Sequence, residues 1–284
     1  MNHLSLFIEL TRLKKPIGFM LLFWPCLWGL TTVYDFNSGL LNYFFYSLLF
    51  LSGSILMRSA GCIVNDIVDE NFDKKVERTK DRPIASKKIS KKLAIIYAVS
   101  LCAIAFLVLI NFNTFTIYMA IASMPLAFTY PLMKRITYWP QLFLGITFNY
   151  GLVLAWISIS NEISIIPIIF YVGAIFWTLG YDTIYGFQDI KDDEIIGVKS
   201  TSIKFKENPK LFVSFCYLIN FILLFYIFKS SEFNLFSINV ILLYVFSLLY
   251  QIFLFNKKKP ETCLKAFKTN NFTGLFLFIF TISI

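Results

Sequence analysis

The sequence predicts an all-α, polytopic membrane protein built from about nine transmembrane helices. Hydrophobic residues make up 57% of its 284 residues and charged residues only 15%, a balance far from that of soluble domains. Apolar runs long enough to cross a bilayer recur along the whole chain. Lys and Arg gather in every second connection between these runs. Together these observations indicate one integral-membrane domain covering residues 1–284.

The apolar runs give the expected order of the helices. Each is close to the ~20 residues that an α-helix needs to cross the hydrocarbon core. The first run is expected to be retained, because no A-x-A-like cleavage site stands near Trp28 to Thr32. The nine runs lie at about 16–34, 40–63, 92–111, 113–133, 139–160, 163–187, 210–229, 234–255 and 266–284.

The distribution of positive charge predicts the orientation in the membrane. Of the 26 Lys and Arg residues, all but Arg58 and Lys229 lie in or beside the N-terminal segment and the connections at 64–91, 134–138, 188–209 and 256–265. The positive-inside rule makes these segments cytoplasmic and places the C-terminus on the opposite side. The net charge of +9 therefore reflects topology in a lipid bilayer rather than nucleic-acid binding. A bacterial inner membrane is expected, because no Arg-rich, Ser-rich leader precedes the first run.

A first concentration of acidic residues follows the second apolar run, in the sequence NDIVDENFD at 65–73. On a helix, Asp66, Asp69 and Asp73 stand at i, i+3 and i+7, so all three project from one face. Carboxylates this dense at the edge of a membrane domain indicate a binding site for cations.

A second concentration lies in the sequence YDTIYGFQDIKDD at 181–193. Its members Asp182, Tyr185, Asp189 and Asp193 again form one stripe at helical period. If the two stripes face each other, each like-charged pair at about 4 Å costs roughly 4 kcal/mol at an effective dielectric constant near 20. A hard cation relieves this repulsion, and oxygen ligands without nearby histidine or cysteine point to Mg²⁺.

Basic residues surround both acidic stripes. Arg78 and Arg82 follow the first stripe, where Pro83 fixes the backbone, and Lys134-Arg135 follows the fourth apolar run. Such side chains are suited to binding a diphosphate beside metal ions. The lysines at positions 74, 75, 87, 88, 91 and 92 are expected to be ordinary topogenic charges.

Arg58 is a separate case, because it lies inside the second apolar run, roughly 12 Å of helix before Asp66. An arginine near mid-membrane costs ~2.5–3.5 kcal/mol, so its side chain is expected to face the bundle interior. Either it binds the anionic end of a second substrate, or it pairs with an interior polar group.

Several kinds of chemistry lack support in this sequence. His3 is the only histidine, so Ser-His-Asp or Cys-His catalysis and a histidine-ligated metal are excluded. The five cysteines show no metal-binding spacing and are expected to be buried hydrophobic residues. There is no G-x-x-x-x-G-K-[ST] phosphate loop. A cation transporter is the alternative from another class, but the acidic residues lie at the membrane edges rather than at the midplane.

The motifs resemble those of the UbiA superfamily of intramembrane prenyltransferases, in its 4-hydroxybenzoate polyprenyltransferase branch. Leu56 to Asp73 carries the family's arginine and its N-D-x-x-D-x-x-x-D motif, and the residues 78–83 are similar to R-T-x-x-R-P. YPLMKR at 130–135 and the stripe D-x-x-Y-x-x-x-D-x-x-x-D from Asp182 match the remaining signatures. Similarity at 15–18 and 270–274 extends the resemblance over nearly the whole chain.

The resemblance implies a nine-helix bundle with a cytoplasmic-side cap over a central cavity. It also implies transfer of a polyprenyl chain from polyprenyl diphosphate to C3 of 4-hydroxybenzoate, in ubiquinone biosynthesis, by Mg²⁺-assisted loss of diphosphate and attack of the ring on the allylic cation. Another quinone-ring precursor, a haem or a chlorin stays open as the acceptor. No obligate protein partner is expected.

By position, the resemblance also implies roles for individual residues. The Mg²⁺ ligands would be Asp66, Asp69, Asp73, Asp189 and Asp193, and Asp182 and Tyr185 would complete the catalytic set. Arg82 and Lys134 would bind the diphosphate, with Lys199 a weaker candidate. Arg58, together with Arg135, would meet the acceptor's carboxylate. The remaining substrate-binding candidates are Asn65 and Arg78.

Overall fold

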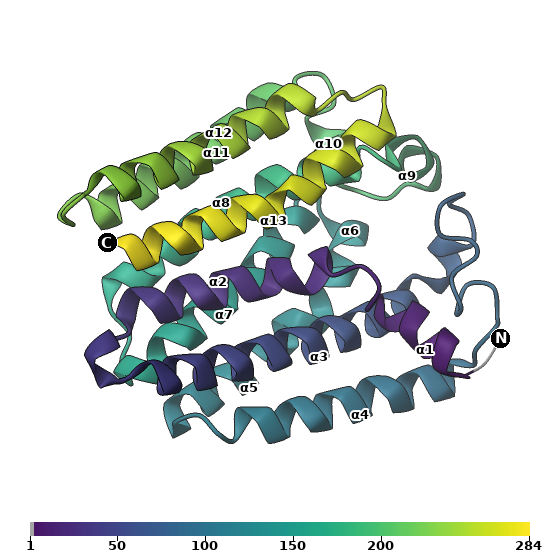
Figure 1. Cartoon of the computed structure of the whole chain (residues 1–284). Helices are drawn as coiled ribbons and strands as arrows, with labels where there is room; N and C mark the ends of the chain where they lie inside the picture. Colours follow the sequence, from purple (N-terminus) through teal and green to yellow (C-terminus); the bar gives the residue numbers. More distant parts are fainter. Residues whose placement is uncertain (1–2) are drawn as a thin grey trace.

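The computed structural model describes residues 3–284, and within this range the regular structure is entirely helical. Nine long helices lie side by side in one bundle, as the nine apolar runs predict (Figure 1). They are α2 (Ile17–Val33), α3 (Leu40–Asp73), α4 (Lys91–Leu109), α5 (Thr114–Thr129), α7 (Pro140–Ser160), α8 (Ile165–Gly186), α11 (Pro209–Phe228), α12 (Leu235–Leu254) and α13 (Pro260–Ser283).

Most of the short helical elements lie toward one end of the bundle, the right-hand end in Figure 1, which we call the polar end. The described N-terminus lies at this end, and the C-terminus lies at the other, as an odd number of crossings requires. The short elements are α1 (His3–Thr11), η1 (Phe36–Ser38), η2 (Tyr130–Leu132), α6 (Met133–Ile136), α9 (Ile190–Ile196) and α10 (Thr201–Lys204).

Composition and length agree with a multi-pass membrane protein. Seven segments within the described range have both the length and the hydropathy to cross a bilayer. The apolar helix α2 has 17 residues, and α13 begins with a polar turn before its apolar part. Large apolar side chains such as Leu107, Leu218 and Phe246 stay exposed on the outer faces, where lipid covers them.

Local sequence signals set the helix ends. The side chains of Ser90 and Asn234 accept backbone N–H groups in the first turns of α4 and α12. Proline begins three further helices at Pro140, Pro209 and Pro260, a position where its missing N–H has no consequence.

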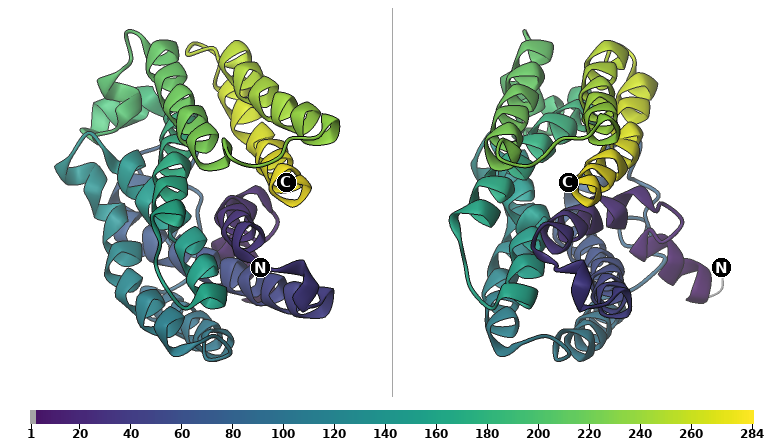
Figure 2. Two further views of the ribbon diagram at one scale, coloured as in Figure 1. Left: turned by 90° about the vertical axis from the view of Figure 1, so that its left-hand side faces the viewer. Right: turned by 60° about the vertical axis from the view of Figure 1, so that its left-hand side comes forward.

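The helices form a ring when the bundle is viewed nearly end-on (Figure 2, left). Helix α2 packs against α3, α7 and α13, and α8 packs against α7, α11 and α13. The approach of α2 to α7 is especially close, because a Cβ on Gly29 would lie 2.3 Å from the carbonyl oxygen of Leu152. Glycine at this position therefore lets the two backbones meet.

Tryptophan side chains fasten α13 to its neighbours inside the bundle. The indole N–H of Trp177 donates to Asn270 Oδ1 at 2.9 Å, and that of Trp28 donates to the carbonyl oxygen of Gly274 at 3.0 Å. These bonds satisfy polar groups that lipid and apolar side chains would leave unpaired.

The structure differs from the sequence pattern at two helix ends, and both lie at the polar end. Helix α3 does not stop at the edge of its apolar run but continues to Asp73, so the whole first acidic stripe lies on one rigid helix. Helix α8 ends at Gly186, and α9 begins only at Ile190. The second acidic stripe is therefore divided between two helices.

Candidate active site

The first acidic stripe lies on the last turns of α3 and faces the interior of the polar end. The exposed fractions of Asp66, Asp69 and Asp73 are only 2%, 1% and 6%. Buried carboxylates are stable only when they are paired or hydrogen-bonded, so their partners define the site.

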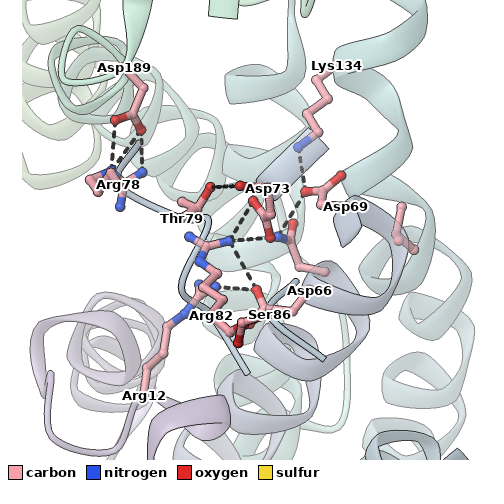
Figure 3. A network of polar contacts seen from close by, with 12 residues as sticks. Arg12, Asp66, Asp69, Asp73, Arg78, Thr79, Arg82, Ser86, Lys134 and Asp189 are labelled. Atoms are coloured by element: carbon pink, nitrogen blue, oxygen red, sulfur yellow. Dashed lines mark hydrogen bonds and ion pairs between the residues drawn. The ribbon is translucent and has the colours of Figure 1, made fainter. Parts of the chain in front are cut away.

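Basic side chains from three separate segments pair with this stripe (Figure 3). Arg12, just after α1, donates to Asp66 at 2.5 Å. Arg82 bridges two carboxylates, at 3.2 Å from Asp66 and 2.9 Å from Asp73. Lys134 of α6 donates to Asp69. The three carboxylates are thus neutralised by the chain's own cations.

The segment 74–90 between α3 and α4 folds back over the end of α3 and positions Arg82. The hydroxyl of Thr79 donates to the carbonyl oxygen of Asp73 at 3.0 Å, and that of Ser86 donates to the carbonyl oxygen of Arg82 at 2.8 Å. Pro83 and Ile84 are buried beneath this loop. The arginine is therefore held on a packed loop rather than on a mobile one.

The second acidic stripe does not form the single helical row that its spacing predicts. Because the chain leaves the helix at Phe187, Asp189 occupies the residue before α9 with φ −117° and ψ 12°. Arg78 binds the Asp189 carboxylate with two nitrogens. Its Nε lies 2.8 and 2.9 Å from the two carboxylate oxygens, and its Nη2 also donates to Oδ2 (Figure 3). Through this pair the 74–90 segment spans both acidic stripes.

A further hydrogen bond joins the 74–90 segment to α9. The backbone N–H of Glu77 donates to the carboxylate of Asp192 at 3.2 Å. Burial raises the pKa of Asp193 to about 6, and the neighbouring Asp189 carboxylate adds to this shift. A carboxyl group held near its titration point by burial and like charge gains stability when a cation approaches.

A cavity of about 90 Å³ opens beside the first stripe, lined in part by Asn65, Tyr130, Lys134 and Asp182. Asp182 lies on α8, whereas Asp189 precedes α9 and Asp193 lies on α9. Asn65 donates to Asp69 Oδ2 at 3.1 Å, so it orients a carboxylate of the first stripe. The cavity thus lies between residues next to the first stripe and Asp182 of the second.

Arg58 lies on α3, deeper in the bundle than the acidic stripe. Its guanidinium carbon is 5.3 Å from the centre of the Phe148 ring, and its buried Nε has no hydrogen-bond partner among the described residues. Gly18 provides the space for it, because a Cβ there would lie 2.9 Å from Nε. An unpaired buried donor of this kind favours an anionic ligand over a purely structural role.

Two further candidates, Tyr185 and Arg135, lie at the rim of the site. Tyr185 lies beneath Arg78, whose guanidinium carbon is 5.7 Å from the ring centre. Arg135 is exposed and donates to the carbonyl oxygen of Val68 at 2.6 Å, with its nearest carboxylate oxygen, on Asp69, 3.9 Å away. Arg135 packs over the ring of Phe72, whereas Arg58 packs over that of Phe148, so their predicted cooperation at one carboxylate stays a prediction.

Lys199 points away from the acidic stripes. Its ammonium donates to the carbonyl oxygen of Ile136 at 3.1 Å and lies 5.7 Å from the ring centre of Tyr138. Its backbone N–H donates to the carbonyl oxygen of Lys134 at 2.8 Å. In this arrangement Lys199 supports the segment that carries Lys134 rather than pairing with a carboxylate.

Comparison with known proteins gives the family. The sequence model of the UbiA prenyltransferase family matches residues 22–280. The chain belongs to the UbiA prenyltransferase family. It is 40% identical over 274 residues to the mitochondrial 4-hydroxybenzoate polyprenyltransferase of Rattus norvegicus, a match covering 96% of this chain and 73% of that protein. It is 38% identical over 275 residues to the 4-hydroxybenzoate octaprenyltransferase of Psychromonas ingrahamii, covering 96% and 93%.

Solved structures of UbiA homologues share this fold. A homologue from Aeropyrum pernix superimposes with a TM-score of 0.77 at 20% identity, covering 92% of this chain and 94% of that one. A homologue from Archaeoglobus fulgidus, bound to GPP and Mg²⁺, superimposes with a TM-score of 0.70 at 17% identity, covering 98% and 100%. The UbiA family assignment and the helical membrane fold predicted from the motifs are thereby confirmed.

The residues of this UbiA protein fit a hard cation. Asp69 Oδ1 is a buried oxygen without a hydrogen-bond partner in residues 3–284, and oxygen-only ligands are those that Mg²⁺ prefers. Within the same residues, no three acidic side chains yet converge on one point. The carboxylates of the first stripe and of Asp189 instead pair with basic side chains, those of Arg12, Arg78, Arg82 and Lys134.

Arg12 is the residue of this site that sequence reasoning missed, since it counted there only as a topogenic charge. It sits in the turn after α1 with φ +55°, a left-handed conformation that a bulky side chain rarely adopts. The position of arginine three residues before Lys15-Pro16 was visible in the sequence, but its contact with Asp66, 54 residues away, was not.

Proposed function

We propose that this protein transfers a polyprenyl chain from polyprenyl diphosphate to C3 of 4-hydroxybenzoate with the help of Mg²⁺. The observation that carries the proposal is the polar end itself, where buried carboxylates and basic side chains meet near Arg58, whose Nε has no hydrogen-bond partner among residues 3–284. The names of the two relatives, and the GPP and Mg²⁺ bound by the Archaeoglobus protein, support the same substrates.

The diphosphate is bound, in this proposal, by the cations that now neutralise the carboxylates. Arg12, Arg82 and Lys134 turn from Asp66, Asp73 and Asp69 toward the phosphate oxygens, and the carboxylates become free to hold metal. Arg78 makes the corresponding exchange at Asp189. Bound Mg²⁺ stabilises the negative charge of the leaving diphosphate and so favours cleavage of the allylic C–O bond.

This exchange avoids an unfavourable state on either side of the reaction. Without ligands, the carboxylates are not left buried and unpaired, because ion pairs satisfy them. With ligands, the arginine forks match the geometry of phosphate oxygens. Positioned donors of this kind stabilise charge that develops as the leaving group departs.

The acceptor ring is proposed to bind in the interior, next to the acidic stripe. Its carboxylate pairs with Arg58, whose Nε has no partner of its own, and its ring packs near Phe148. The allylic C–O bond breaks, the C3–C bond forms, and the ring then loses the proton from C3. Asp182, which lines the cavity, is the proposed acceptor of that proton.

The cavity must widen for an aromatic ring to enter. Its volume of about 90 Å³ is smaller than the ~150 Å³ of an apolar cavity known to admit benzene. Lys134 is both a lining residue and the partner of Asp69, so its movement toward a diphosphate enlarges the same space. In this proposal, binding of the prenyl donor therefore widens the space next to Asp182.

We also propose that the polar end faces the cytoplasm, because the Lys- and Arg-rich connections lie there. A donor made by soluble enzymes would reach the site from that side. A bacterial inner membrane stays a prediction.

The experiment that tests the proposal is prenylation of labelled 4-hydroxybenzoate by membranes that contain this chain. Donors of several prenyl lengths are offered, with Mg²⁺ or with EDTA. We expect product only with Mg²⁺, and its loss in Asp66→Asn and Asp189→Asn. Asp81→Asn is the matched control, because this exposed aspartate forms no ion pair with any residue in 3–284.

Two results would contradict the proposal. Product formation that persists in EDTA would show that the reaction does not need a metal ion. Folded protein that prenylates another aromatic ring, but never 4-hydroxybenzoate, would show that the proposed acceptor is wrong while the family membership still holds.

A further inference from the structure

A second concavity lies at the polar end, and none of its lining residues belongs to the site described above. It is a groove of about 560 Å³ between the start of α11 and the connection from α12 to α13. Its lining includes Glu207, Lys210, Leu211, Phe253, Lys257 and Lys259. The reaction proposed above gives this groove no role.

The rim of the groove is strongly basic. The two connections that form it, 204–210 and 256–265, contain seven lysines and two glutamates. Lys210, Lys257 and Lys259 are exposed, and no residue within 3–284 forms an ion pair with any of them. Glu207 is the one acidic residue in the lining. The groove therefore carries net positive charge that the protein does not neutralise.

Hydrogen bonds between the two connections fix this charge in place. Lys257 donates to the carbonyl oxygens of Lys206 at 3.0 Å and Glu207 at 3.3 Å, which ties one connection to the other. The hydroxyl of Thr262 donates to the carbonyl oxygen of Lys259 at 2.7 Å, and the side chain of Asn256 accepts the N–H of Lys258 at 3.0 Å. The lysines thus project from an ordered rim.

The other part of the groove is apolar and faces outward. Leu211, in the first turn of α11, is 72% exposed, and Phe253, in the last turn of α12, is 82% exposed. Below them the exposed faces of the two helices continue with Phe215 and Leu249. This surface lies against lipid in a membrane, so the groove joins a basic rim to the acyl region of the bilayer.

We propose that this groove binds one anionic phospholipid from the leaflet at the polar end. The lipid phosphate lies between Lys210 and Lys259, and an acyl chain lies along Leu211 and Phe253. Position and charge complementarity favour this occupant, because juxtamembrane lysines attract anionic headgroups and repel the choline of zwitterionic ones. A soluble phosphate compound uses the basic rim alone and makes no contact with the apolar half.

The test uses the purified full-length protein, stripped of lipid in detergent, and titrates phosphatidylglycerol or phosphatidylcholine while native mass spectrometry counts the lipids retained. We expect one phosphatidylglycerol to bind preferentially. The double variant Lys210→Gln/Lys259→Gln is expected to bind it about 30-fold more weakly, at roughly a tenfold change for every 1.4 kcal/mol and ~1 kcal/mol for each lysine.

The control Lys87→Gln/Lys92→Gln removes two exposed lysines from another connection at the same end and should leave the affinity for phosphatidylglycerol unchanged. A third variant, Phe253→Ser, removes acyl contact and should also weaken binding. Equal affinity for phosphatidylcholine, equal losses in the control, or full competition by soluble glycerol phosphate would each overturn the proposal. Circular dichroism of every variant establishes that it is folded.

Discussion

The polar end and the middle of the bundle satisfy their buried polar groups in different ways. In the middle, neutral donors such as the indole of Trp177 bond to fixed acceptors on a packed neighbour. At the polar end, charged side chains from loops and short helices meet charged carboxylates on α3. The first kind of contact joins neutral groups on packed helices, whereas we propose that the second exchanges partners when a diphosphate and a cation bind. Stability is therefore concentrated in the middle and chemistry at the polar end.

The largest expected effect tests whether ion pairing identifies the residues that act. Lys134→Gln should lower kcat/KM for prenyl transfer about 10²–10³-fold, the loss typical of a removed charge-stabilising donor. Lys199→Gln is the matched control, because the Lys199 ammonium faces a backbone carbonyl instead of a carboxylate, and it should lose less than about tenfold. Steady-state kinetics of both variants decide this. Equal losses would mean that the present ion pairs do not mark the diphosphate site.

Next in size is a change confined to the middle of the bundle. Gly29→Ala places a Cβ against the carbonyl oxygen of Leu152, so overpacking should lower the free energy of unfolding by ~1–3 kcal/mol. Gly53→Ala in α3 is the control, because a Cβ there would have no atom within 4 Å, and it should be neutral or slightly stabilising. Thermal unfolding in detergent compares the two. Similar midpoints would show that α2 and α7 tolerate separation.

A smaller effect concerns ligands that share the polar end. Mg²⁺ alone and inorganic diphosphate alone should each raise the unfolding temperature little, because the ion pairs compete with both. Together they should bind with a coupling of about tenfold or more. The Asp189→Asn variant should lose most of this joint effect. A full rise with Mg²⁺ alone would contradict the exchange of partners, since the carboxylates would then be free already.

The smallest effect measures one hydrogen bond in the middle of the bundle. Trp177→Phe removes the donor to Asn270 and should destabilise the protein by ~0.6–1.7 kcal/mol without altering KM. Trp156→Phe is its control, because the buried indole N–H of Trp156 has no partner among the described residues, and its removal should be neutral or stabilising. Unfolding midpoints and kinetics of both variants test this. A fall in activity for Trp177→Phe alone would show that this hydrogen bond in the middle of the bundle also affects the reaction.

Sequence reasoning succeeded where a property depends on one helix and failed where it depends on two. The row Asp66, Asp69, Asp73 follows from helical period within α3 and appears in the structure as expected. The row starting at Asp182 does not form a single helical row, because α8 ends at Gly186 and α9 begins only at Ile190. Periodicity carries no information about such a break.

The ion pairs lay beyond the sequence for a related reason. Contacts such as Arg12 with Asp66 or Arg78 with Asp189 join segments 54 and 111 residues apart, and tertiary packing alone decides them. The order of the long helices was easier to predict, because each helix needs only a long apolar run and a polar connection. Motif resemblance supplied the candidate residues, and their roles stay predictions, but it did not say which of them face one another.

The bridge from Arg78 to Asp189 also has a consequence for biogenesis. It joins the connection after α3 to the connection after α8, so the two halves of the site are synthesised far apart in time. A ribosome-bound chain that has inserted only its first four long helices carries Asp66, Asp69 and Asp73 without the second acidic segment. Chains are made N-terminus first. If both acidic segments are needed, as proposed above, we therefore expect the nascent protein to be inactive until α8 and α9 have been inserted and assembled.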